Sequence, residues 1–258
     1  MLRKISTLVI GLCFYLSLFV LPAQAADDEI TVTVGEWPPF LSQSLEEGGV
    51  IAQLIKAVFA ADGVDANIAF LPWGRGYSET SEGEHDAMGV WMHKVEREAE
   101  FYYSDPVLIE KFVFFHRKDA DFDWQTLEDI KGYRLGGGIK YSYGAEFDKA
   151  LASGLFSMDR APNDEINFKK LLIDRVQLYP QEISVGYFAM QNKLSKEEQA
   201  QITHHPKAIL NNESFVLFPK SLPGSKALMA RFNRRLKEFR ETGKYQLFID
   251  RLKPGKSS

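Results

Sequence analysis

Strand-like and helix-like segments alternate along the first part of this chain, and their order constrains its fold more than any other feature. Alternating or β-branched apolar residues, typical of strands, occur over residues 30–34, 66–71 and 87–91. Segments that favour helices lie between them, at residues 50–59 and 73–81. This β-α-β-α-β order predicts a parallel sheet, with any ligand beyond the carboxyl ends of its strands.

A second alternation of strands and helices follows a mostly apolar strand at residues 112–116. Its strands are predicted over residues 133–137 and 176–179, and its helices over residues 142–152, around Phe168 and over 183–190. A returning strand at 214–218 precedes a helix whose apolar face carries Leu228, Phe232, Leu236 and Phe239, and a last short helix at 245–252.

Two crossing strands predict an α/β fold of two Rossmann-like lobes joined by a two-stranded hinge, an arrangement that permits closure around a ligand. The predicted boundaries are residues 26–111 and 219–258 for lobe 1, 112–118 and 212–218 for the hinge strands, and 119–211 for lobe 2.

The first 25 residues have the pattern of a secretory signal peptide. Arg3 and Lys4 precede an apolar core over residues 8–21 that is too short for a stable membrane-spanning helix. Ala23-Gln24-Ala25 then gives the small-x-small pattern of a cleavage site. An uncleaved membrane anchor is the alternative. The pattern predicts export to the periplasm.

Cysteine content and charge narrow the possible partners. Cys13, the only cysteine, falls within the predicted signal peptide, which excludes a disulfide framework and a thiolate metal site from the mature chain. Acidic residues, 35 in all, outnumber the 31 basic ones, and no basic block occurs. This balance argues against nucleic acid and anionic lipid as partners. We expect a monomer that binds a small molecule and needs no cofactor.

Several short motifs occur in order along nearly all of the mature chain: Gly35-Glu-Trp-Pro-Pro-Phe40, Gly83-x-x-Asp86, Glu96-Arg97, Phe101-x-x-Ser104-Asp105-Pro106, Ile130-Lys-Gly132 and a Gly-Lys-Tyr-Gln-Leu run from Gly243. In these motifs the chain resembles family 3 of the bacterial extracellular solute-binding proteins, the periplasmic receptors of polar-amino-acid ABC transporters. The resemblance implies the type II periplasmic-binding-protein fold and a ligand of the amino-acid or organic-acid class. It also implies delivery to an inner-membrane ABC permease and no enzyme activity.

The resemblance assigns the ligand's carboxylate to Arg97. A planar guanidinium suits a carboxylate because it donates two parallel, charge-assisted hydrogen bonds. The alternative is a surface arginine that pairs with Glu96 or Glu98. Family members often carry a threonine three residues before this arginine, where this chain has Lys94. That lysine either adds a second positive charge to the cleft or points to solvent.

The resemblance also implicates two polar residues of the second lobe. Glu182 occupies the position from which an acidic residue binds the ligand's α-ammonium, and Ser142 the position of a small hydroxyl residue that contacts the carboxylate. Glu182 is alternatively a glutamate favoured by the dipole at the start of a helix. Ser142 is also predicted to cap the helix that follows it, a role compatible with contact to an anion.

Aromatic side chains follow the strands of the first lobe and are candidates for the walls of the cleft. Trp37, Trp73 and Trp91 come after its three predicted strands in turn, where rings can sandwich a ligand or stack on a cation. Each ring is alternatively part of the core. The remaining candidates are two polar residues and a ring on the opposing wall: Glu36, Arg75 and Tyr141.

Other classes of function have weaker support. His204 and His205 are adjacent and make a poor chelate, so no metal site is expected. No Gly-x-Ser-x-Gly elbow or similar nucleophile pattern occurs. Two alternatives to a transport receptor stay open. One is a periplasmic dehydratase acting on a prephenate-like acid, a kind of enzyme that resembles this family, and the other is a ligand-sensing partner protein.

Overall fold

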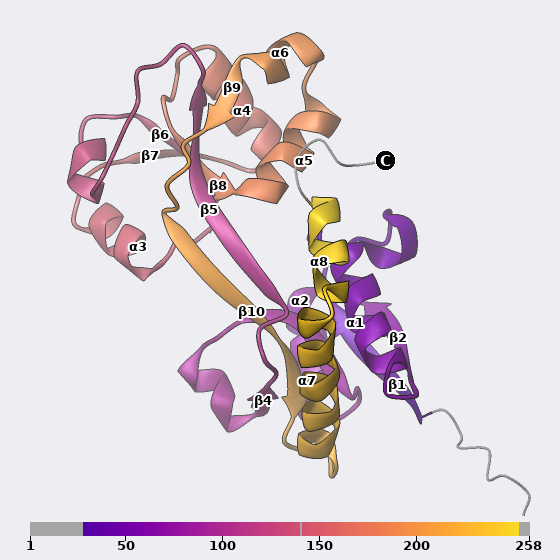
Figure 1. Cartoon of the computed structure of the whole chain (residues 1–258). Helices are drawn as coiled ribbons and strands as arrows, with labels where there is room; N and C mark the ends of the chain where they lie inside the picture. The colour runs from indigo at the N-terminus through magenta and orange to yellow at the C-terminus, as the bar shows by residue number, and fades with distance from the viewer. Residues whose placement is uncertain (1–27, 140, 253–258) are drawn as a thin grey trace, which may run out of the picture.

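The computed structural model describes residues 28–139 and 141–252, so the predicted signal peptide lies outside the described residues. Figure 1 shows two lobes joined by the long strands β5 (Leu108–Arg117) and β10 (Leu210–Pro219). None of the described helices is long and apolar enough to cross a membrane.

The lower lobe in Figure 1 is built on the three parallel strands predicted first. β1 (Asp28–Val34) lies between β2 (Val64–Phe70) and β3 (Ala87–Met92) and runs parallel to both. α1 (Val50–Ala60) connects β1 to β2, and α2 (Trp73–Glu82) connects β2 to β3. The predicted β-α-β-α-β order is confirmed. Because the strands are parallel, the loops after them gather at one edge of the sheet.

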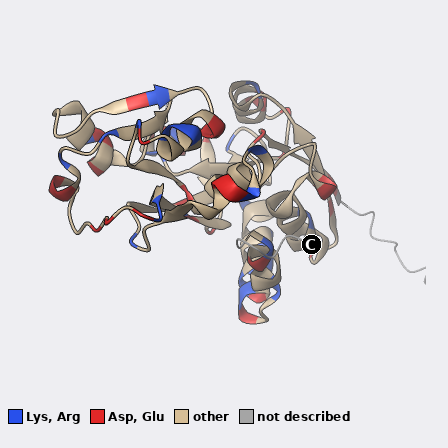
Figure 2. Ribbon diagram, turned by 90° about the horizontal axis from the view of Figure 1, so that it is seen from above, with Lys and Arg blue, Asp and Glu red and all other residues tan. Residues whose placement is uncertain are grey.

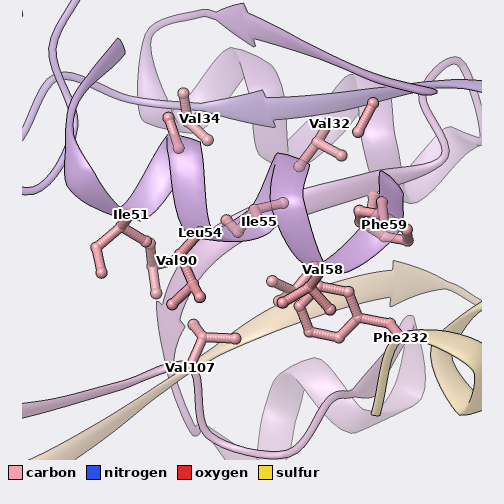
Figure 3. Close-up of a cluster of buried hydrophobic side chains, with 14 of the residues drawn as sticks. Val32, Val34, Ile51, Leu54, Ile55, Val58, Phe59, Val90, Val107 and Phe232 are labelled. Atoms are coloured by element: carbon pink, nitrogen blue, oxygen red, sulfur yellow. The ribbon is translucent and has the colours of Figure 1, made fainter. Parts of the chain in front are cut away.

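Helices cover this sheet and complete the core of the first lobe. α1 packs with α7 (Ser225–Glu241) on one face, where Val32, Ile55 and Phe232 are fully buried (Figure 3). The apolar face predicted for the long C-terminal helix is confirmed, because its members are buried or partly buried in this core: Leu228, Phe232, Leu236 and Phe239. Tyr77 of α2 packs against a separate small cluster. The chain continues through α8 (Lys244–Ile249) and a 3₁₀ turn (Asp250–Leu252).

β5 and β10 are antiparallel and pair with each other only between the lobes, where residues 108–112 face residues 210–214. Beyond this crossing, β10 joins the first lobe beside β3 and β4 (Phe101–Tyr103). In the other direction, β5 joins the second lobe beside β8 (Tyr179–Glu182) and β9 (Ile202–His204). The fold is therefore α/β, with two lobes joined by a pair of strands, as predicted.

The second lobe is a smaller β/α unit. β6 (Leu135–Gly138) and β7 (Met158–Ala161) are parallel, and a parallel bridge from Leu135 to Leu178 links β6 to the segment that leads into β8. The carboxyl ends of β6, β7 and β8 thus lie at one edge. The helices of this lobe are α3 (Ala145–Ala152), α4 (Asp164–Leu172), α5 (Ile183–Lys193) and α6 (Lys196–Ala200).

Three boundaries predicted for the second lobe are wrong. The strand predicted over 133–137 begins at Leu135, the one predicted over 176–179 lies at 179–182, and the helix predicted from Ser142 begins at Ala145. The sequence does not predict β7, because Met-Asp-Arg-Ala has neither β-branched residues nor a clear alternation. β7 is a strand because β6 lies beside it.

Candidate ligand-binding site

The candidate site begins with the loops at the carboxyl edge of the first lobe. Residues 35–40 follow β1, α2 begins soon after β2, and the 3₁₀ turn Val95–Ala99 follows β3. Seven predicted site residues lie in or beside these segments: Glu36, Trp37, Trp73, Arg75, Trp91, Lys94 and Arg97. Figure 2 shows basic and acidic residues interspersed on both lobes, so the site is not part of a large field of one sign.

Two of the predicted tryptophans contact each other. The rings of Trp73 and Trp91 meet edge to face, with centroids 5.3 Å apart, and Tyr77 packs on Trp91 at 5.6 Å. Gly35 allows this packing, because a Cβ built on it would lie 2.1 Å from a ring carbon of Trp73. The loop after β1, the start of α2 and the end of β3 are therefore joined by one aromatic cluster.

Arg97 lies on this aromatic cluster. Its guanidinium carbon is 4.3 Å from the ring centroid of Trp91, and its Nη1 donates a 2.9 Å hydrogen bond to the carbonyl of Met92. No carboxylate within the described ranges forms a salt bridge with Arg97, so the predicted alternative pairing with Glu96 or Glu98 is not seen. The half-buried cation keeps further N–H donors, which can hold a carboxylate.

Lys94 is held through its backbone rather than its side chain. Its N–H donates to the Tyr103 hydroxyl at 3.2 Å, and that hydroxyl donates back to the Lys94 carbonyl at 3.2 Å. The residue is exposed. Its ammonium forms no ion pair with any residue of the described part of the chain. Both predicted positions, in the cleft or in solvent, are compatible with this geometry.

The other candidates of the first lobe contact residues that are close to them in the sequence. Glu36 accepts hydrogen bonds from the backbone and side-chain nitrogens of Gln43, at 3.0 and 3.2 Å, and the backbone bond is the main cause that lowers its pKa. Arg75 is exposed and forms a 2.6 Å salt bridge with Glu79 one turn along α2. Trp37 packs on Phe40, with ring centroids 4.5 Å apart, against the core of the lobe. These contacts stabilise the loop and the helix.

The loop after β6 carries the candidates Tyr141 and Ser142. The ring of Tyr141 covers Gly138, where a Cβ would lie 2.7 Å from it, and this residue is 51% exposed. The prediction that Ser142 caps α3 is wrong, because the N-cap is Gly144. The Ser142 hydroxyl instead donates to the carboxylate of Asp148. An anion that approached Ser142 would meet that negative charge.

Glu182 ends β8 and caps α5. It is 3% exposed, and its Oε2 accepts a 2.9 Å hydrogen bond from the backbone N–H of Val185. Its pKa is raised to about 7, mainly by burial and to a smaller extent by the charge of Glu110, against the backbone bonds from Val185, Ser184 and Lys111, which lower it. Its arrangement is that of the predicted alternative, a glutamate at the start of a helix.

One residue at the same edge was not found from the sequence. Asp164 is the first residue of α4, directly beyond β7, and is half-buried. Its Oδ1 accepts hydrogen bonds from the Tyr179 hydroxyl and, at 2.6 Å, from Gln181 Nε2. The only local signal was Asn163, which caps α4 just before it. Because the sequence does not predict β7, the cap at Asn163 does not indicate that Asp164 follows the end of a strand.

The described residues contain no group of three or more His, Cys, Asp and Glu side chains that could hold a metal ion. A surface pocket on the second lobe lies away from the candidate site. Leu135 and Met158, the first residues of β6 and β7, line it together with Arg134 and Arg175. It therefore opens at the amino edge of the sheet and includes none of the predicted site residues.

Known proteins share both the sequence pattern and the fold. The family model of the bacterial extracellular solute-binding proteins, family 3, matches residues 30–251. The structure of YckB from Bacillus subtilis has a TM-score of 0.71 at 18% identity, over 89% of this chain and 90% of that chain. Substrate-binding domain 2 of Lactococcus lactis GlnP, in an open conformation, has a TM-score of 0.70 at 16% identity, over 88% and 96%.

A histidine kinase sensor domain with similarity to periplasmic binding proteins has a TM-score of 0.64 at 17% identity, over 88% of this chain and 96% of that chain. A comparison with curated protein sequences gave no match. Identities this low establish the fold alone, which is that of the type II periplasmic binding proteins.

Proposed function

We propose that this chain, which belongs to family 3 of the bacterial extracellular solute-binding proteins, is a periplasmic receptor for a small amino-acid-like ligand. It delivers that ligand to an inner-membrane ABC permease. Arg97 is the observation that carries the proposal: a guanidinium held on Trp91, without a carboxylate partner in the described structure, at the carboxyl edge of the first sheet. An exported chain, as residues 1–25 predict, would meet its ligand in the periplasm.

Closure of the lobes is the mechanism that we propose for this receptor. For this mechanism we keep the boundaries predicted from the sequence: residues 26–111 and 219–258 for lobe 1, residues 119–211 for lobe 2, and hinge strands at 112–118 and 212–218. The pairing of residues 108–112 with 210–214 supports a pivot there. A ligand that contacts both lobes favours the closed state by its differential affinity for that state, and the permease distinguishes the two states.

Ligand binding is tested by thermal unfolding of the purified protein with a panel of proteinogenic L-amino acids and related organic acids. A ligand at a hundred times its Kd stabilises the folded state by about 2.7 kcal/mol. For a protein of this size the Tm should rise by about 5–10 °C. An unchanged Tm with every compound of the panel would contradict the proposed ligand class.

The two alternative functions make different demands on the site. A dehydratase for a prephenate-like acid needs a general acid that reaches its substrate. The two carboxylates among the candidate site residues, Glu36 and Glu182, are held by Gln43 and by the start of α5. The sensing alternative shares the binding step and differs only in the partner, and a sensor domain has the same fold. Conversion of prephenate by the purified protein would favour the dehydratase.

A further inference from the structure

We propose that the ligand is an amino acid with a large apolar side chain. That side chain packs against four residues that we call the apolar rim: Met92 and Val95 of the first lobe, and Ile139 and Tyr141 of the second. The inference rests on the proposed function and deepens it, because it names the class of side chain that the receptor selects. Recognition of the α-carboxylate and the ammonium group stays as the resemblance implies.

The apolar rim consists of large hydrophobic side chains that the protein leaves exposed. Val95 is 72% exposed, and the other three are 43–52% exposed. Over residues 28–139 and 141–252, eight large hydrophobic side chains are exposed, and half of them belong to the rim. Single exposed hydrophobic residues are ordinary, but several that gather in one place mark a binding surface.

The two halves of the rim lie at edges that face each other. Met92 ends β3 and pairs with Ser214 of β10, which also pairs with Leu108 of β5. β8 ends at Glu182, opposite Phe112 of β5. The ends of β3 and β8 therefore lie four residues apart along β5. At the usual rise per residue of a strand this separation is about 13 Å.

The loop after β6 is on the same side of the second lobe. A parallel bridge joins Leu135 of β6 to Leu178, just before β8, so the carboxyl end of β6 also points toward the crossing strands. Ile139 and Tyr141 follow that end directly. A ligand between the lobes would therefore have rim residues on both sides, and the proposed closure would bring them onto it.

The rim continues the aromatic cluster that holds Arg97. Met92 follows Trp91, whose ring centroid lies 4.3 Å from the guanidinium carbon of Arg97, and the Met92 carbonyl accepts the bond from Arg97. Val95 begins the 3₁₀ turn that carries Arg97. A carboxylate bound by Arg97 would place the rest of the ligand beside these apolar side chains.

Three polar candidates of the site already have partners within the protein. Hydrogen bonds or ion pairs join Glu36 to Gln43, Arg75 to Glu79 and Ser142 to Asp148. A polar ligand side chain would have to displace these partners, and a displaced group left without a new bond costs free energy. Burial of the rim against an apolar side chain needs no such exchange and removes apolar surface from water.

Isothermal titration calorimetry of the purified protein with single L-amino acids tests the inference. We expect leucine, phenylalanine or methionine to bind at least about tenfold more tightly than alanine, because burial of a large apolar side chain favours binding by such a factor. Serine, glutamine and arginine should bind more weakly than these three. Glutamate tests Lys94, whose ammonium forms no ion pair with the described residues. The heat capacity change of binding should be more negative for the apolar ligands than for alanine.

Two rim variants, Val95→Asn and Ile139→Asn, test the contact itself. Each should lower the ratio of the affinity for the tightest apolar amino acid to that for alanine, by about threefold or more, because the ligand side chain loses an apolar neighbour. Ile173→Asn is the matched control, because Ile173 is 74% exposed and follows α4 near the amino edge of the second sheet. It should keep the ratio of the wild type. All three positions are exposed, so each variant should melt within a few degrees of the wild type.

The outcomes distinguish the inference from the proposed function. A tightest ligand with a polar or charged side chain overturns the inference and leaves the receptor intact. An equal loss of affinity for every amino acid in Ile139→Asn also overturns it, because the rim then packs lobe on lobe rather than on a side chain. An unchanged ratio in both rim variants has the same meaning. If the wild type binds none of the amino acids, the proposed function fails, and the inference fails with it.

Discussion

Replacement of Arg97 by alanine should lower the affinity for the amino-acid ligand of the proposed receptor about 30-fold or more. The guanidinium lies 4.3 Å from the Trp91 ring, donates one bond to the Met92 carbonyl and has no carboxylate partner among the described residues. A ligand carboxylate would supply that partner, and truncation of one member of such a desolvated pair commonly costs about 2–5 kcal/mol. Calorimetric titration of the tightest amino acid measures the change.

Two control variants make the Arg97 experiment specific. Arg97→Lys keeps the charge but loses the planar pair of donors, so its affinity should fall between those of the wild type and Arg97→Ala. Arg251→Ala removes an exposed arginine whose Nη1 donates to Gln53 Oε1, far along the chain from the candidate site, and should bind normally. Binding by Arg97→Ala within threefold of the wild type would show that the resemblance misplaces the carboxylate site.

Much of the fold follows from patterns of apolar residues in the sequence. β1 and α1 combine strong periodicity with nearly complete burial of their apolar positions, and the face of α7 that carries Phe232 is buried as expected. In segments of this length, the alternation typical of strands or the spacing typical of helices recurs more often than chance would produce. The apolar runs at 112–116 and 214–218 also reveal β5 and β10, but most of the residues that pair between the lobes, 108–112 and 210–214, lie outside these runs.

The second lobe is harder to predict because tertiary contacts decide its short elements. The segment before α3 forms a loop, because Tyr143 is buried there and its hydroxyl accepts a 2.6 Å bond from the Gly138 amide. That contact moves the start of the helix from Ser142 to Ala145. β7 has no strand pattern of its own and depends on β6. A missing strand also hides the residue that follows it, which is how Asp164 escapes a sequence-based search.

Part of the candidate site can likewise be predicted from the sequence, and part of it cannot. Motif order makes Arg97 a candidate, and the rule that parallel strands share an edge predicts that Trp73 and Trp91 lie near it, as they do. Local partners cannot be predicted in this way. The salt bridge from Arg75 to Glu79 and the capping role of Glu182 depend on side-chain directions, which the spacing of residues leaves undetermined.

Replacement of Glu182 by glutamine should stabilise the protein above pH 7 and have little effect near pH 4. Burial raises the pKa of Glu182 from 4.5 to about 7, with a smaller contribution from Glu110. Between these values the folded state holds a proton that the unfolded state has released, so the free energy of unfolding falls as the pH rises through this range. The fall amounts to at most about 3 kcal/mol, and glutamine, which has no charge, removes it.

Urea unfolding of the wild type and Glu182→Gln at pH 4, 5, 6, 7 and 8 measures this difference, with the exposed Glu29→Gln as the matched control. Glu29→Gln should keep the pH dependence of the wild type. Glu110 is buried beside Ser214 of β10, and burial raises its pKa too, so part of the slope should persist in Glu182→Gln. A loss of stability in Glu182→Gln at pH 8 would mean that the backbone amides at the start of α5 outweigh burial and keep the carboxylate charged. In the expected case, ionisation of Glu182 weakens the junction of β5, β8 and α5, beside the crossing strands at which we propose that the lobes pivot.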